Sequence, residues 1–137
     1  MKIAVAVDGS EHAFRAAKYA LTLLKNAQDA ELEVISVTDY NKVEDEQLLL
    51  QNLKSLSLYQ DRMVRPVVEL AEKAGVKTTI TFLRGNPDQE IINYLHMGNV
   101  EQLVLGSRGM NIMQEVILGS VSRSVMEKAN CPVTIVK

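Results

Sequence analysis

The chain has 137 residues, of which 47% are hydrophobic and 23% are charged, and its formal net charge is -2. This length and composition are typical of one soluble globular domain with a single core. The weak negative charge disfavours binding to nucleic acid or to acidic lipid. The single cysteine excludes an internal disulfide and a cysteine-based zinc cluster. Since no run of about 18 apolar residues occurs and Asp8 interrupts the N-terminal apolar run, we expect a cytoplasmic protein without a membrane span.

Apolar runs that predict strands alternate along the chain with segments that predict helices. Ile3–Val7 is a short run rich in β-branched residues, bounded by Asp8-Gly9-Ser10, and it predicts a buried strand. Ser10 then suits the N-cap of a helix. The apolar face of that helix has a helical spacing and consists of Ala13, Ala16, Ala17, Ala20, Leu21 and Leu24.

The same alternation continues to the end of the chain. Further strands are expected at Glu31–Thr38, Val76–Leu83, Leu103–Leu105 and Val133–Val136. Further helices are expected up to Ala74, with Gly75 as the residue that ends the helix, and at Pro87–Met97 and Gly119–Ala129. The leucine-rich stretch Asp39–Tyr59 fits no single element, and Pro66 predicts either a kinked helix or two separate pieces.

Strands that alternate with helices indicate a parallel sheet covered by helices on both faces. Ligands of such sheets bind beyond the carboxyl ends of the strands, where the strand order reverses. The loops after the first and fourth strands are therefore the places to search for a site.

Two loops at these strand ends carry candidate ligand-binding residues. Asp8-Gly9-Ser10 follows the first strand, and a glycine pattern, G-x-x-G, nine residues, then G-S, runs from Gly106 to Ser120 after the fourth. Gly119 opens a helix whose free N–H groups and dipole favour an anion, and the hydroxyls of Ser120 and Ser122 add donors. The pattern matches neither common phosphate-binding fingerprint. On spacing alone, glycines that only end strands and cap helices explain it equally well.

The order of these segments resembles the universal stress protein family, whose nucleotide-binding members carry the pattern G-2x-G-9x-G-(S/T). The resemblance covers the whole chain, from KIAVAVDGSEHAFRAAKYAL through GNPDQEII and LVLGSRG to LGSVSRSVMEKANCPVTIVK. It implies a single-domain, Rossmann-like α/β fold over residues 1–137, with an open five-stranded parallel sheet in the order 3-2-1-4-5. It also implies a homodimer, for which the apolar edge strand Val133–Val136 is the expected interface.

The resemblance implies that the switch point between strands 1 and 4 holds ATP, with or without Mg²⁺. Asp8 would contact the ribose or the Mg²⁺, although an aspartate that only closes a turn is the alternative. Val37 would read the adenine edge through its backbone. Ala6 and Val7 would line the adenine pocket or belong to the core.

The phosphate end of the expected site lies on the glycine pattern. Val121 would contribute its backbone there, and Arg108 would either approach the phosphates or face solvent. The residues expected to hold ribose and phosphates are Gly106, Gly109, Gly119, Ser120 and Ser122.

The family resemblance thus favours an ATP-binding protein with a regulatory or stress-response role. Efficient phosphoryl transfer needs more than the single acid Asp8, so at most slow hydrolysis is expected. The alternative is a dimeric interaction module of the same family without a nucleotide role. A flavin carrier or a receiver domain on the same sheet is disfavoured, because the loop after the first strand is acidic and Arg84-Gly85 follows the third.

Overall fold

The computed structural model describes residues 1–39, 53–109 and 118–137. Strands and helices alternate in it as the sequence predicts, with shifts of one or two residues at their ends. The described elements are β1 (Lys2–Ala6), α1 (Glu11–Leu24), β2 (Glu31–Thr38), α3 (Leu53–Lys73), β3 (Lys77–Arg84), α4 (Pro87–Met97), β4 (Gln102–Gly106), α5 (Ser120–Lys128) and β5 (Val133–Val136). None of these helices is both long enough and apolar enough to cross a membrane.

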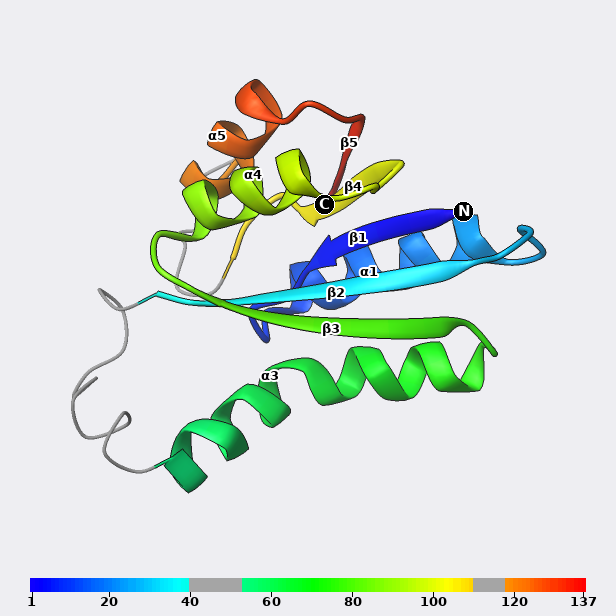
Figure 1. The fold of residues 1–137 in the computed structure, drawn as a ribbon, viewed down its shortest axis with the longest axis horizontal. Coiled ribbons are helices and arrows are strands. Elements are labelled where there is room, and N and C mark those ends of the chain that lie inside the picture. The colour runs from blue at the N-terminus through cyan, green and yellow to red at the C-terminus, as the bar shows by residue number, and fades with distance from the viewer. Residues whose placement is uncertain (40–52, 110–117) are drawn as a thin grey trace.

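The five described strands form one parallel sheet in the order β3-β2-β1-β4-β5, which confirms the expected order (Figure 1). Val5 in β1 pairs with Val34 on one side and with Val104 on the other. The strands after β1 are therefore added first on one side of it, as β2 and β3, and then on its other side, as β4 and β5. In such a sheet the ends of β1, β2 and β4 form the crevice where ligands bind.

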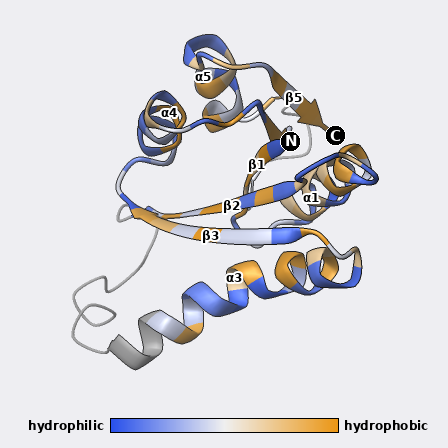
Figure 2. Ribbon diagram, turned by 45° about the vertical axis from the view of Figure 1, so that its right-hand side comes forward, coloured by the Kyte–Doolittle hydropathy of each residue, from blue (hydrophilic) through white to orange (hydrophobic). Residues whose placement is uncertain are grey.

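Helices cover both faces of the sheet (Figure 1). On one face α1 and α3 pack against the strands through buried side chains such as Leu24 and Val67. On the other face α4 and α5 pack through Ile91 and Val125. Figure 2 shows the striped, amphipathic surface of α3 and the apolar character of β5, which forms one edge of the sheet.

The start of α1 is set by a side-chain cap, as the sequence predicts. The hydroxyl of Ser10 accepts a hydrogen bond of 3.1 Å from the N–H of Ala13. The predicted apolar face is buried, which places α1 on the sheet beside the end of β1. Gly75 follows the carboxyl end of α3, as the sequence predicts. It has a φ of +69°, a left-handed conformation that glycine adopts without strain.

The two-piece alternative at Pro66 is wrong, since α3 is assigned as one helix that contains this proline. A proline in a helix leaves the carbonyl four residues earlier without its donor. Here that carbonyl belongs to Arg62, and both Arg62 and Pro66 lie on the exposed side of the helix, where water can replace the lost bond. Of the stretch Asp39–Tyr59, residues 40–52 lie outside the described residues, Asp39 follows β2, and residues 53–59 form the first part of α3.

Candidate functional site

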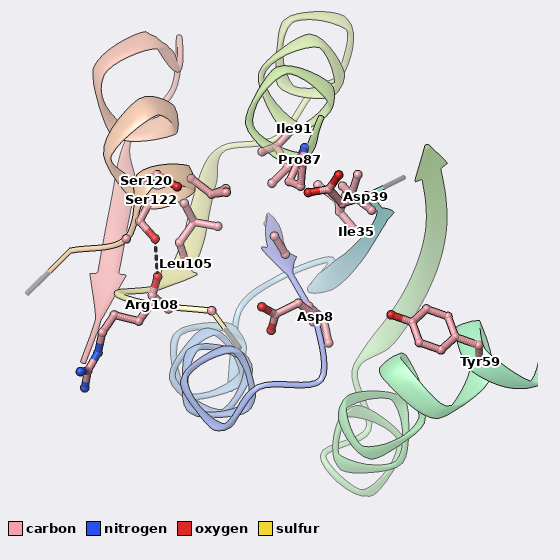
Figure 3. Close-up of a pocket in the computed structure, with 17 residues that line it drawn as sticks. Asp8, Ile35, Asp39, Tyr59, Pro87, Ile91, Leu105, Arg108, Ser120 and Ser122 are labelled. Carbon is pink, nitrogen blue, oxygen red and sulfur yellow. Dashed lines mark hydrogen bonds between the residues drawn. The ribbon is translucent and has the colours of Figure 1, made fainter. Parts of the chain in front are cut away.

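A cavity of about 290 Å³ lies at the carboxyl ends of β1, β2 and β4, beneath the first turns of α4 and α5 (Figure 3). The eleven site residues predicted from the sequence all line it. They are Ala6, Val7, Asp8, Val37, Gly106, Arg108, Gly109, Gly119, Ser120, Val121 and Ser122. The fold therefore gathers in one pocket residues from two loops about 100 positions apart in the sequence.

Sequence reasoning missed six lining residues: Ile35, Asp39, Tyr59, Pro87, Ile91 and Leu105. A usable signal existed for Asp39, because it follows a strand end just as Asp8 does. Pro87 and Ile91 reach the pocket because α4 packs over the sheet at this point. The spacing of apolar residues along the chain predicts a helix here, but it does not predict where that helix packs on the sheet.

The first turn of α5 can bind an anion. Gly119 precedes the helix with φ -69° and ψ 163°, and no side chain among the described residues caps the helix. The N–H of Gly119 itself donates to the carbonyl of Ser107 at 2.8 Å, which fixes the loop. The N–H groups of Ser120 and Val121 belong to the unsatisfied set at a helix start and lie at the positive end of its dipole.

The hydroxyl of Ser122 has a different role from the expected one. Ser122 is buried, and its Oγ donates to the carbonyl of Gly106 at 2.7 Å, so this proton is not available to a ligand. The bond ties α5 to the end of β4. Ser122 therefore shapes the pocket, and Ser120, which is exposed, is the serine that can offer its hydroxyl.

Two glycines of the pattern allow close contacts within the protein itself. A Cβ at Gly106 would lie 2.8 Å from the backbone carbon of His12, so Gly106 lets β4 end directly against the start of α1. A Cβ at Gly109 would lie 2.6 Å from Oδ2 of Asp8. The other oxygen of Asp8, Oδ1, accepts from the N–H of Ser10 at 2.9 Å. The loops after β1 and β4 thus meet at the floor of the pocket.

Arg108 is half-buried, so it does not take the solvent-facing position that was one of the two expected for it. Its side chain points away from the other lining residues (Figure 3), and Nη2 lies 3.0 Å from Nε2 of His12. A guanidinium only donates, so this ring nitrogen accepts and the imidazole is neutral. Burial, followed by the charges of Arg108 and Arg15, lowers the pKa of His12, which agrees with this arrangement.

A second hollow, of about 200 Å³, adjoins the pocket between the first turns of α4 and α5. It shares Asp39, Pro87, Ser120 and Val121 with the pocket and adds Asn86 and Asp88. The carboxylate of Asp88 accepts from the hydroxyl of Ser124 at 2.8 Å, which links α4 to α5. The hollow therefore borders the pocket along their shared residues.

The described residues contain no group of three His, Cys, Asp or Glu side chains that could hold a metal ion by themselves. Mg²⁺ commonly binds through one carboxylate and the phosphates of a nucleotide. Asp8 fits that arrangement, since it lines the pocket and presents Oδ2 beside Gly109. The lining as a whole combines apolar walls, two carboxylates and an anion-binding helix start, a combination suited to a small amphipathic anion.

A model of the universal stress protein family matches residues 1–137. A comparison with curated proteins finds no match. Among solved structures, the hypothetical protein MJ0577 is 27% identical, with a TM-score of 0.87 over 99% of this chain and 94% of that one. Universal stress protein UspA from Lactobacillus plantarum is 24% identical, with a TM-score of 0.81 over 100% and 97%. The universal stress protein from Archaeoglobus fulgidus in complex with dAMP is 23% identical, with a TM-score of 0.73 over 100% and 98%.

Proposed function

The chain belongs to the universal stress protein family, and we propose that it binds an adenine nucleotide in the pocket at the carboxyl ends of β1, β2 and β4. The phosphates would lie at the first turn of α5, and the base would lie among the apolar side chains of β1, β2 and α4. In this proposal residues 1–137 act as one nucleotide-binding domain with a regulatory or stress-response role in the cytoplasm.

The observation that carries the proposal is the start of α5 at the wall of the pocket. Ser120 and Val121 line the cavity and have helix-start N–H groups without a side-chain cap among the described residues. Such groups bind phosphate oxygens well. Proteins of the same fold have been solved with dAMP, with cAMP and, from Arabidopsis thaliana, with AMP, and these complexes support an adenine nucleotide as the ligand.

ATP is the ligand that we propose for the cell, with Mg²⁺ held by its phosphates and by Asp8. The hollow of about 200 Å³ that adjoins the pocket at Ser120 and Val121 has room for further phosphates, and Mg²⁺ would offset the carboxylates of Asp39 and Asp88 there. Asp8 is a carboxylate placed to accept from a ribose hydroxyl or to bind the ion, and both roles suit its position against Gly109.

We propose that the protein uses this nucleotide as a signal of state rather than as a substrate for fast turnover. Rapid phosphoryl transfer needs a lysine or arginine that contacts the phosphates in addition to a metal ion. Arg108 is the one cation among the described residues that line the pocket, and its guanidinium is turned toward His12. At most slow hydrolysis is consistent with this arrangement.

Among the described strands β5 lies at one edge of the sheet, and this position suits a homodimer. The N–H groups of Leu103 and Ser107 donate to the carbonyls of Pro132 and Val136, so the even-numbered residues of this segment face β4. Backbone groups alternate along a strand, so those of Val133 and Ile135 face outward. A second copy of the chain that pairs along β5 would satisfy them, as edge strands require.

The nucleotide site is tested by two substitutions at Ser120, the first residue of α5. Proline is tolerated at this helix position and accepts an extended preceding residue such as Gly119, so Ser120→Pro removes one N–H while the helix stays intact. We expect Ser120→Pro to weaken AMP and ATP binding about tenfold, measured by isothermal titration. Ser120→Ala keeps the N–H and should stay within about threefold of the unmodified chain. Equal affinities for all three proteins would contradict the proposal.

An interaction module without a nucleotide role is the second candidate, and one observation favours it. Leu58 in α3 is 57% exposed, and Ile80 and Phe82 in β3 are 39% and 41% exposed. Apolar side chains this accessible are a common feature of protein-binding surfaces. A failure of millimolar AMP, ADP and ATP to raise the unfolding temperature of nucleotide-stripped protein would favour this candidate over the nucleotide-binding one.

A further inference from the structure

Tyr59 is the only aromatic residue among the described residues that line the proposed nucleotide pocket. It lies in α3, which packs on the face of the sheet opposite to α4 and α5. Its side chain enters the cavity from that face, and its hydroxyl is directed inward on the side of Asp8 (Figure 3). The ring is 38% exposed, so one of its surfaces is available to a ligand.

The position of Tyr59 suits contact with the part of a nucleotide that lies away from the phosphates. Tyr59 borders the main cavity but not the adjoining hollow at Ser120 and Val121. A base that lies against β1, β2 and α4 has its other side turned toward α3. An aromatic side chain stacks on any base, and such a contact commonly strengthens binding about fivefold to a hundredfold.

The first part of α3 is weakly attached to the sheet. Among its described side chains none before Val64 is fully buried, and the buried ones are Val64, Val67 and Ala71. Residues 57–59 are all exposed. Helical segments with few buried contacts open at a low free energy. A ligand that contacts Tyr59 would therefore add an attachment where the protein itself supplies little.

Pro66 separates this first part of α3 from the part that is anchored by burial. Proline has no N–H, so the carbonyl of Arg62 lacks its helical hydrogen bond. Fewer backbone bonds therefore join the turn before Pro66 to the turn after it. Before the proline, Nε of Arg65 donates to Oδ2 of Asp61 at 2.9 Å, which holds consecutive turns together. The segment before Pro66 can therefore change its stability as a unit.

We propose that Tyr59 packs its ring against the bound nucleotide and thereby couples occupancy of the pocket to the stability of α3 before Pro66. The inference rests on the proposed nucleotide site and adds the helix that responds to its occupancy. A nucleotide that acts as a signal of state requires such a responding element, and α3 lies at the surface of the molecule (Figure 1).

The first test replaces Tyr59 and measures AMP binding by isothermal titration. Tyr59→Phe keeps the ring, and its affinity should stay within about twofold of the unmodified chain. Tyr59→Leu keeps an apolar side chain that favours a helix but removes the ring, so the affinity should fall about fivefold or more. Tyr19→Leu is the matched control and should leave the affinity unchanged, because Tyr19 is 42% exposed on α1 and does not line the pocket.

The second test measures amide hydrogen exchange with and without AMP. In the unmodified chain and in Tyr59→Phe, saturating AMP should slow exchange at residues 59–63 about tenfold or more. In Tyr59→Leu, saturated with AMP to the same degree, exchange there should slow by less than about threefold. A tyrosine that only supports the helix would alter exchange equally with and without AMP.

The outcomes separate this inference from the proposed function. If AMP binds and Tyr59→Leu keeps the affinity of the unmodified chain, Tyr59 does not contact the ligand. If AMP leaves exchange at residues 59–63 of the unmodified chain unchanged, occupancy is not coupled to α3. Either result overturns the inference while the nucleotide site stands. If AMP does not bind the unmodified chain, both the site and the role of Tyr59 are overturned.

Discussion

Gly109 lies directly against the carboxylate of Asp8, because a Cβ at residue 109 would approach Oδ2 of Asp8 to 2.6 Å. The two residues lie in loops after β4 and β1, strands that pair with each other in the sheet. This contact explains why the second glycine of the pattern has no side chain. The glycine leaves the carboxylate in place at the floor of the pocket.

Gly109→Ala should therefore displace Asp8 and weaken nucleotide binding about tenfold, through lost contacts to the ribose or the ion. The end of an exposed side chain can move cheaply, so the free energy of unfolding should change by less than about 1 kcal/mol. Titration calorimetry and urea denaturation would measure the two effects. Gly98→Ala, in the turn after α4, is the control and should leave the affinity unchanged. A Gly109→Ala variant with normal affinity would show that Asp8 does not contact the ligand.

Gly106→Ala, in contrast to Gly109→Ala, should affect the free energy of unfolding more than nucleotide binding. Its Cβ would lie 2.8 Å from the backbone carbon of His12 and 2.9 Å from Cβ of His12. Backbone in a packed helix cannot move aside cheaply, so we expect a loss of about 1–3 kcal/mol in the free energy of unfolding. Urea denaturation would measure it. A loss below about 0.5 kcal/mol, the range of ordinary surface substitutions, would mean that the contact between β4 and α1 is looser than described.

The pair of His12 and Arg108 predicts a pH dependence of stability. Burial, Arg108 and Arg15 lower the pKa of His12 in the folded chain, while Glu11 and Asp8 oppose that shift. The unfolded chain therefore binds a proton at His12 more readily than the folded chain does. The contribution of His12 to the free energy of unfolding is fully present above the unfolded pKa of about 6.5, and it is lost as the pH falls below that value.

His12→Gln keeps a neutral acceptor for Arg108 and cannot titrate. Between pH 7.5 and pH 5, the free energy of unfolding should fall more steeply for the unmodified chain than for this variant. The difference between the two proteins removes the contribution of the carboxylates. Parallel curves would mean that His12 takes up its proton equally well in the folded chain.

The outward edge of β5 predicts a dimer that depends on the backbone of Ile135. Light scattering after gel filtration should give a mass twice the 15.2 kDa of one chain. Ile135→Pro removes one outward N–H and is compatible with an edge strand, so it should shift the mass to that of the monomer. Ile135→Val retains the N–H and should remain dimeric. A monomeric unmodified chain at micromolar concentration would contradict this prediction.

Much of the fold follows from local patterns in the sequence. The apolar run before Asp8, the spaced alanines of α1 and the residue pair Ala74-Gly75 mark their elements without ambiguity, because burial and backbone conformation act locally there. Pro66 shows the limit of a local rule. Whether a proline breaks a helix depends on whether water reaches the carbonyl of Arg62, which is a property of the packed structure.

The site was predictable where it lies on strand ends and loops. Asp8 and the glycine pattern precede helices, and the order of elements brings them together. The contributions of Pro87 and Ile91 depend on how α4 packs over the sheet, which no pattern along the chain encodes. The use of the Ser122 hydroxyl by Gly106 was missed for a similar reason, since that bond joins residues 16 positions apart.

The proposed nucleotide lies between the start of α5 and the end of β2. The most direct test is a titration of ¹⁵N-labelled chain with AMP, followed by nuclear magnetic resonance of the backbone amides. We expect the largest shifts at Ser120 and Val121 and at Val37 and Asp39, with small shifts along β5. Shifts confined to other parts of the chain, or none at millimolar AMP, would contradict it.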